Sequence, residues 1–151
     1  MIHISTIVLF LHIISAVIWI GGMIAIRVAV HPVLQSFEDN QLKLGSTLKI
    51  VGRLFNLVIP FILILLASAL FFELKLNINN PITHIKEAIW TVMTLNFVVM
   101  YIKRAKAIIL FNNGKLQKAK ESVAIIPKLL LPINIFLGVI AIILGVILRG
   151  L

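Results

Sequence analysis

The stretch IHISTIVLFLHIISAVIWIGGMIAIR, residues 2–27, decides the fold of this chain, because its only charged residue is the arginine at its end. About 20 apolar residues are needed to cross roughly 30 Å of hydrocarbon as a helix. His12 nevertheless lies about 8 residues into this run, or roughly 12 Å along a helix axis. Polar side chains at such depth are costly and usually face a protein interior or carry a function. His12 is therefore the first candidate functional residue.

The whole chain has the composition of an integral membrane protein. Hydrophobic residues make up 61%, charged residues 13%, and the mean hydropathy is +1.14, whereas a soluble domain is nearer half apolar and a quarter charged. Continuous apolar runs favour helices over a closed barrel, whose strands alternate. The 151 residues predict one all-α domain, a four-transmembrane-helix bundle in the lipid bilayer, with spans at about residues 4–26, 54–72, 85–102 and 129–148.

The basic residues predict the orientation of the bundle. Of the 14 Lys and Arg, three (Lys75, Lys86 and Arg149) lie on the side of the termini, and the other eleven lie between spans one and two or three and four. The positive-inside rule then predicts basic cytoplasmic loops and termini on the periplasmic side of a bacterial inner membrane. A net charge of +9 arranged in this way suits anionic lipid headgroups, and no nucleic-acid partner is expected.

Proline and polar residues predict the helix boundaries. His31-Pro32 is expected to end the first helix, because proline lacks a donor and disfavours helix before it. Residues 36–53 mix charges with leucines and predict a short interfacial helix leading into span two. Pro60 is expected to kink span two.

The third helix is expected to begin with Thr83 as its N-cap and Glu87 in its first turn. It should continue past the membrane as a basic extension to Phe111. Asn79-Asn80-Pro81 and Asn112-Asn113-Gly114 predict the turns before and after it, and a second basic helical segment is expected from Leu116.

The helical face around His12 is the main candidate for a cofactor site. Trp19 and Gly22 share that face, and its other members are small or flexible: Ser15, Ala16 and Met23. A partner helix or a flat cofactor could approach closely here. His12 is thus a candidate axial ligand for haem iron. The alternative is a packing histidine that makes an interhelical hydrogen bond, for example to Thr91 or Thr94.

A second candidate is His84 with Lys86, at the outer mouth of span three. His84 and His12 belong to the same half of the membrane, but His84 is about two helical turns shallower. Ligation of one metal by His12 and His84 would require span three to begin deeper. Lys86 could hold an anionic substrate group or extend to the interface, and His84 could be a solvated interfacial histidine.

The remaining candidates are weaker. His31 is 19 residues beyond His12, at the inner face, so the two cannot bind one iron; His3 is terminal. Arg27 and Arg53 could bind porphyrin carboxylates or anchor the membrane edge. The chain has no cysteine, which excludes thiolate metal sites and c-type haem attachment. The methionines are scattered and poorly suited to copper: Met1, Met23, Met93 and Met100.

Leu11-His12, Trp19 and Gly21-Gly22 resemble the opening helix of small four-helix membrane proteins, the copper-resistance CopD-type family and the HemJ-type protoporphyrinogen oxidases. His84-x-Lys86 and Asn134 extend this resemblance. It implies that His12 ligates haem b and that the reaction is the six-electron oxidation of protoporphyrinogen IX, linked to a respiratory electron acceptor. The chain departs from the HemJ pattern after the glycines and at Ile135, where that family tends to carry Glu.

The sequence thus predicts an inner-membrane redox protein that binds haem b or a porphyrin. The cofactor residues are His12, His84, Lys86, Trp19 and Gly22, with His12 and His84 as metal ligands; catalytic residues remain unassigned. The alternatives are a copper-handling protein, or a non-catalytic subunit whose polar residues serve helix packing. A stripe of small residues in span four permits a homodimer.

Overall fold

The computed structural model describes residues 3–76 and 81–147, leaving aside the side chain of Leu76. Every regular element in these ranges is helical. Four helical segments are long and apolar enough to cross a membrane, which confirms the predicted all-α class with four membrane helices. In chain order the elements are α1 (Ile4–Ala25), the π-helical turn η1 (Ile26–Val30), α2 (His31–Gln35), α3 (Asn40–Leu76), α4 (Pro81–Asn112), α5 (Leu116–Ile125), the π-helical turn η2 (Ile126–Leu130) and α6 (Leu131–Ile147).

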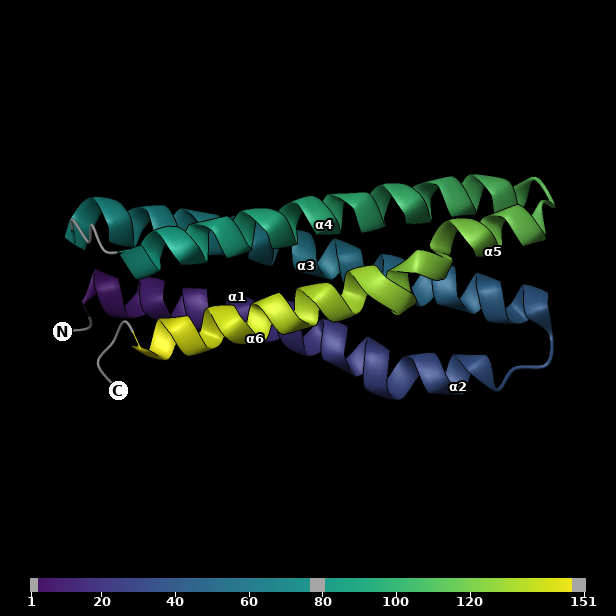
Figure 1. Cartoon of the computed structure of the whole chain (residues 1–151), viewed down its shortest axis with the longest axis horizontal. Helices are drawn as coiled ribbons and strands as arrows, with labels where there is room; N and C mark the ends of the chain where they lie inside the picture. The colour runs from purple at the N-terminus through teal and green to yellow at the C-terminus, as the bar shows by residue number, and fades with distance from the viewer. Residues whose placement is uncertain (1–2, 77–80, 148–151) are drawn as a thin grey trace.

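The four segments form an elongated bundle (Figure 1). α1 packs against α3 and α6, whereas α4 packs against α3, α5 and α6, so α1 and α4 occupy opposite corners. Aromatic rings fill the centre between these corners. The Trp19 and Phe97 rings meet edge to face with centroids 6.3 Å apart, and Phe55 packs on Phe97 at 5.0 Å. Such edge-to-face pairs stabilise a core beyond the area that they bury.

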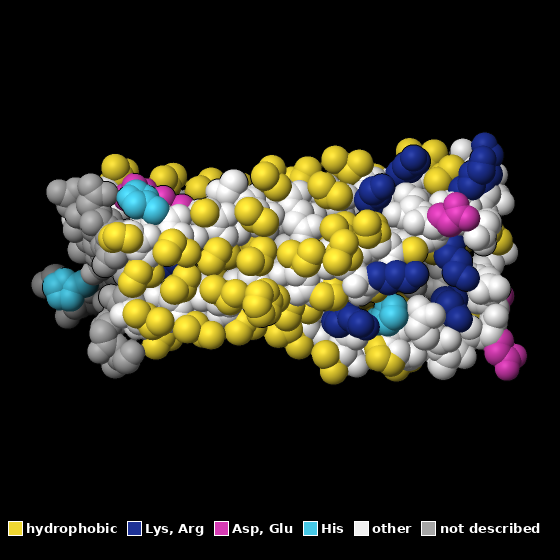
Figure 2. Space-filling model, in the orientation of Figure 1, with side chains coloured by type: hydrophobic (Ala, Val, Ile, Leu, Met, Phe, Trp, Pro, Cys, Tyr) yellow, Lys and Arg dark blue, Asp and Glu magenta, His cyan; other side chains and the backbone are white. Residues whose placement is uncertain are grey.

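The surface divides into an apolar body and a basic end (Figure 2). Large aliphatic side chains are exposed along all the long helices, among them Leu63, Val92 and Ile143. In water such a surface would aggregate, so it is suited to lipid. Lys and Arg gather at the end of the bundle that holds α2 and α5 (Figures 1 and 2).

The first helix continues past Pro32, so the expectation that His31-Pro32 would end it was wrong. The His31 amide donates to the Ile26 carbonyl, five residues back. This wider π turn accommodates the proline ring, and α2 follows directly. η2 repeats the device: the Leu131 amide donates to the Ile126 carbonyl immediately before Pro132. Pro32 and Pro132 therefore both lie within continuous helical segments.

The interfacial helix expected over residues 36–53 is instead the first part of α3. The Asp39 carboxylate accepts the backbone amides of Gln41 at 2.7 Å and Leu42 at 3.2 Å, and so caps a helix that begins at Asn40. Leu44 and Leu48 are buried against the bundle, so the segment packs on protein. The helix then continues through Pro60 without a break.

The third helix begins at Pro81, two residues before the expected cap. Proline suits a first helical position because its missing donor is not needed there. Thr83 is therefore not the N-cap, and Glu87 lies beyond the first turn. The extension beyond the span is confirmed, since α4 reaches Asn112. Gly114 turns the chain with a φ of 71°, and the predicted helix from Leu116 follows. Asn79, Asn80, Leu148 and Arg149 lie outside the described residues.

Candidate functional site: an intramembrane histidine

His12 lies half-buried on α1 and contacts α3. Its Nδ1 is 2.7 Å from the Ser68 hydroxyl oxygen, and its ring meets Phe72 edge to face at 6.3 Å. α1 and α3 pack along their length, which holds these side chains together. The interhelical hydrogen bond that belonged to the alternative interpretation, a packing histidine, therefore exists, but its partner is Ser68 and not Thr91 or Thr94. Thr91 instead donates to the Glu87 carbonyl on its own helix.

Ser68 links His12 to the backbone of α3. The Ser68 oxygen lies 2.7 Å from the Ile64 carbonyl and 2.9 Å from the Leu65 carbonyl. The direction of the contact with His12 depends on the imidazole tautomer. When the hydroxyl donates to one of the two carbonyls, its oxygen accepts from a protonated Nδ1, and Nε2 of a neutral imidazole then carries the lone pair that a metal ion requires.

Trp19 and Gly22 lie deeper on the face of α1 that packs into the bundle. Trp19 is 1% exposed and stacks edge-on against Phe97. A Cβ at Gly22 would lie 2.7 Å from the Leu54 side chain, so this glycine allows α3 to pack closely. Gly138 on α6 plays the same part: a Cβ there would lie 2.7 Å from Ile20. These small residues hold helices together in the described structure.

His84 and Lys86 lie on α4, at the opposite corner of the bundle from α1. The His84 side chain is 61% exposed, and its Nδ1 is 3.1 Å from the Glu87 carboxylate on the same helix. The Lys86 ammonium reaches toward α6, where it is 3.5 Å from the position of a Cβ at Gly145. His84 is therefore held at the surface by its own helix, and Lys86 turns inward.

A second polar contact joins α4 to α6. Asn96 donates to the Asn134 side-chain oxygen at 2.7 Å and to the Leu130 carbonyl at 2.8 Å, and Asn134 donates to the Met93 carbonyl at 3.1 Å. Asn134 is fully buried. The sequence marks both residues as polar groups within spans, but their pairing depends on the packing of α4 on α6.

Three buried polar atoms among the described residues make no hydrogen bond: Trp19 Nε1, Trp90 Nε1 and Thr94 Oγ1. Buried polar groups are normally satisfied, so each exception calls for an explanation. Trp19 comes two turns after His12 on α1, and Trp90 and Thr94 lie one turn apart on α4. The span-one face that carries His12 thus also carries an unsatisfied indole donor.

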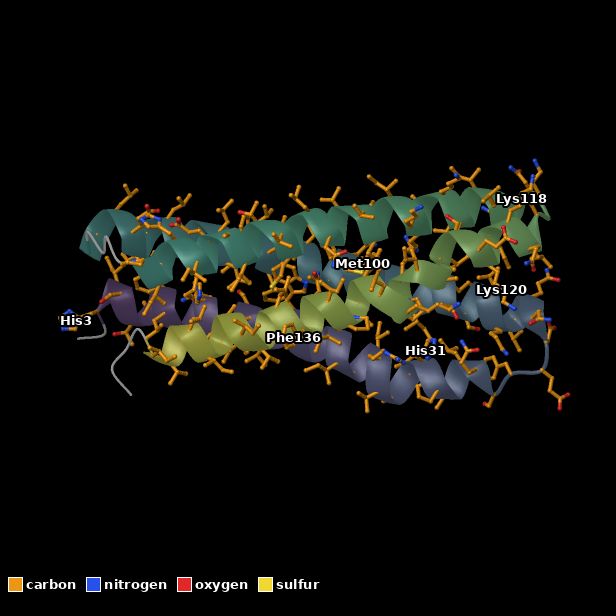
Figure 3. All side chains as sticks on the ribbon, in the orientation of Figure 1. His3, His31, Met100, Lys118, Lys120 and Phe136 are labelled. Atoms are coloured by element: carbon orange, nitrogen blue, oxygen red, sulfur yellow. The ribbon has the colours of Figure 1, made fainter. Side chains whose placement is uncertain are left out.

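The other candidates do not assemble into a metal site. His3 and His31 lie at opposite ends of the bundle (Figure 3), in agreement with the sequence spacing. Over residues 3–76 and 81–147, no three His, Cys, Asp or Glu side chains gather closely enough to hold a metal ion. Met23, Met93 and Met100 are buried in the core.

The residues present fit haem at one axial position, where His12 would supply a ligand nitrogen and Ser68 would orient its ring as outer-shell partners orient metal-ligating histidines. Comparisons of the chain with family models, curated proteins and solved structures found no match.

Proposed function

We propose that this chain is an integral membrane redox protein that binds haem b, or a related porphyrin, with His12 Nε2 as an axial ligand. The observation that carries the proposal is the hydrogen bond between His12 Nδ1 and the Ser68 hydroxyl. It positions the ring of a histidine that lies within a membrane span, where polar side chains usually face a protein interior or carry a function.

The chain contributes position and environment to this site. Ser68 holds the imidazole, Phe72 limits its rotation by packing on the ring edge, and the surrounding aliphatic side chains lower the local dielectric. Bound haem would supply one-electron chemistry, whose potential depends on the axial ligand and on burial.

The membrane setting follows from the same fold. The protein is multi-pass, since four of its helical segments can span a bilayer. We further propose a bacterial inner membrane with the basic end of the bundle toward the cytoplasm, because eleven of 14 Lys and Arg lie between predicted spans one and two or three and four. His12 then lies in the outer half of the bilayer.

The resemblance to HemJ-type proteins points to the reaction to test after haem binding, the oxidation of protoporphyrinogen IX with electrons passed to a respiratory acceptor. Protoporphyrinogen should accumulate in a strain that lacks this protein, and the wild-type gene should reverse the accumulation. Normal porphyrin levels in the deletion strain would restrict the proposal to electron transfer.

Absorbance of the detergent-purified protein, oxidised and dithionite-reduced, tests the proposed site. The wild type should show a Soret band that His12→Ala loses. His31→Ala removes a histidine at the far end of the bundle and should retain the band, as a matched control. Loss of the band in His84→Ala as well would make His84 the second ligand. A wild type without a Soret band after haem reconstitution would refute the haem proposal and leave His12 as a packing residue.

A further inference from the structure

A recess opens at the basic end of the bundle, remote from His12. It is a partly open hollow between the helices, and part of its empty space belongs to the open surroundings of the bundle. η1, α3 and η2 contribute most of its wall. The lining is largely aliphatic and includes Ile26, Val30, Val51, Leu54, Ile126 and Leu131.

The two π-helical turns shape this recess. η1 and η2 both border it, and each lies immediately before an X-Pro pair, His31-Pro32 or Leu131-Pro132. A π turn displaces the helix locally and occurs often at functional sites. The recess is therefore built by two irregularities placed at the same end of the bundle.

Arg104 is the cationic member of the lining. The side chain is half-buried, and its Nε donates to the Leu48 carbonyl at 2.9 Å. The guanidinium lies directly over Gly52, where any Cβ would collide with it. Gly52 thus provides the space that lets Arg104 cross α3.

Within the described ranges no carboxylate forms an ion pair with the guanidinium. Around it the same end of the bundle carries Lys49, Arg53 and Lys103, all exposed. Figure 2 shows basic side chains gathered there beside an apolar surface. This combination of an aliphatic recess and an uncompensated arginine matches an amphiphile with an anionic head.

We propose that this recess binds one anionic phospholipid. An acyl chain of the lipid packs against the aliphatic wall, and its phosphate binds the Arg104 guanidinium. Basic pockets between membrane helices on the cytoplasmic side bind acidic headgroups in this way. The guanidinium can donate two parallel hydrogen bonds to phosphate oxygens. A neutral or zwitterionic headgroup compensates the positive charge of the arginine less well, because it has no net negative charge. The inference is independent of haem at His12.

Native mass spectrometry of the detergent-solubilised protein tests this site. The probes are dioleoyl phosphatidylglycerol and dioleoyl phosphatidylcholine, titrated separately. The wild type should bind phosphatidylglycerol about tenfold more tightly. Arg104→Gln should remove that preference, whereas Lys103→Gln, which removes a neighbouring exposed charge, should keep it.

Two further variants separate a positioned guanidinium from bulk charge and from misfolding. Gly52→Ala retains every charge but displaces Arg104, and should lose the preference. Gly21→Ala, at a helix position where a Cβ meets nothing within 4 Å, should keep it. Helical circular dichroism and a single elution peak establish folding, and if Arg104→Gln does not fold then Gly52→Ala decides.

Three results would overturn the proposal. One is equal binding of the two lipids to the wild type. Another is an equal loss of preference in Arg104→Gln and Lys103→Gln, which would show a general charge effect. The last is displacement of the lipid by inorganic phosphate at concentrations comparable to those of the lipid, which would show an anion site without an acyl-chain site.

Discussion

Two of the polar contacts between helices of the bundle are built differently. Asn96 and Asn134 join α4 to α6 in a closed network, in which both side-chain amides donate to backbone or side-chain oxygens and Asn134 is fully buried. His12 and Ser68 join α1 to α3 through a hydrogen bond between their side chains, and the imidazole is only half-buried.

This difference distinguishes a contact that serves helix packing from a contact that is a candidate functional site. A closed amide network satisfies its members and cannot titrate, so it serves to hold α6 on α4. An imidazole, in contrast, can ligate a metal through Nε2 in the tautomer that carries its proton on Nδ1. Stability should therefore depend chiefly on the asparagine contact and haem binding chiefly on the histidine contact.

The largest effect on stability is expected where α6 approaches its neighbours most closely. Gly138→Leu would place atoms where Ile20 and Met93 already lie, and overpacking of this kind costs about 2–3 kcal/mol. Thermal unfolding in detergent measures the change. Gly21→Leu, where a Cβ meets nothing within 4 Å, is the matched control. Equal destabilisation by both variants would show that the cost belongs to helix glycines in general.

Removal of the asparagine network should have the next largest effect. Asn134→Leu leaves Asn96 without its side-chain acceptor and should lower the free energy of unfolding by about 1–2 kcal/mol. The Soret band should be unchanged. Asn56→Leu, at an exposed position of α3, should not destabilise the protein. Loss of haem in Asn134→Leu with the fold intact would contradict the division between the two contacts.

The smallest effect on stability is expected at Ser68. Ser68→Ala removes one interhelical hydrogen bond, which is worth about 0.6 kcal/mol in a membrane protein. The same change should weaken haem binding about tenfold, because it removes the outer-shell partner of the ligand. A haem titration measures this, and Ser68→Thr, which keeps the hydroxyl, should retain most of the affinity. Unchanged haem affinity in Ser68→Ala would show that Ser68 does not orient the ligand.

Hydropathy predicts the coarse fold correctly, because a long apolar run in lipid has few alternatives to helix. The interruptions at proline were harder to predict. Pro32 was expected to end a helix, and the π turn before it instead continues the helix. Asp39 caps a helix that begins at Asn40, within the segment 36–53 predicted as a separate interfacial helix, and Leu44 and Leu48 pack on the bundle.

The candidate site was only half predictable from the sequence. His12 is conspicuous because it is polar within an apolar run. Its partner Ser68 is one of several small polar residues in the spans, and its depth relative to His12 depends on how α3 packs on α1. Arg104 was counted only as a charge, since its place over Gly52 requires two helices to meet.

The measurement that tests the central claim most directly is chemical rescue of His12→Gly. The variant is purified with haem, and its spectrum is recorded with and without added imidazole. If His12 is an axial ligand, the variant should lack the Soret band of the wild type, and imidazole should restore it by occupying the space left by the side chain. A wild-type Soret band that persists in His12→Gly without imidazole would contradict the claim.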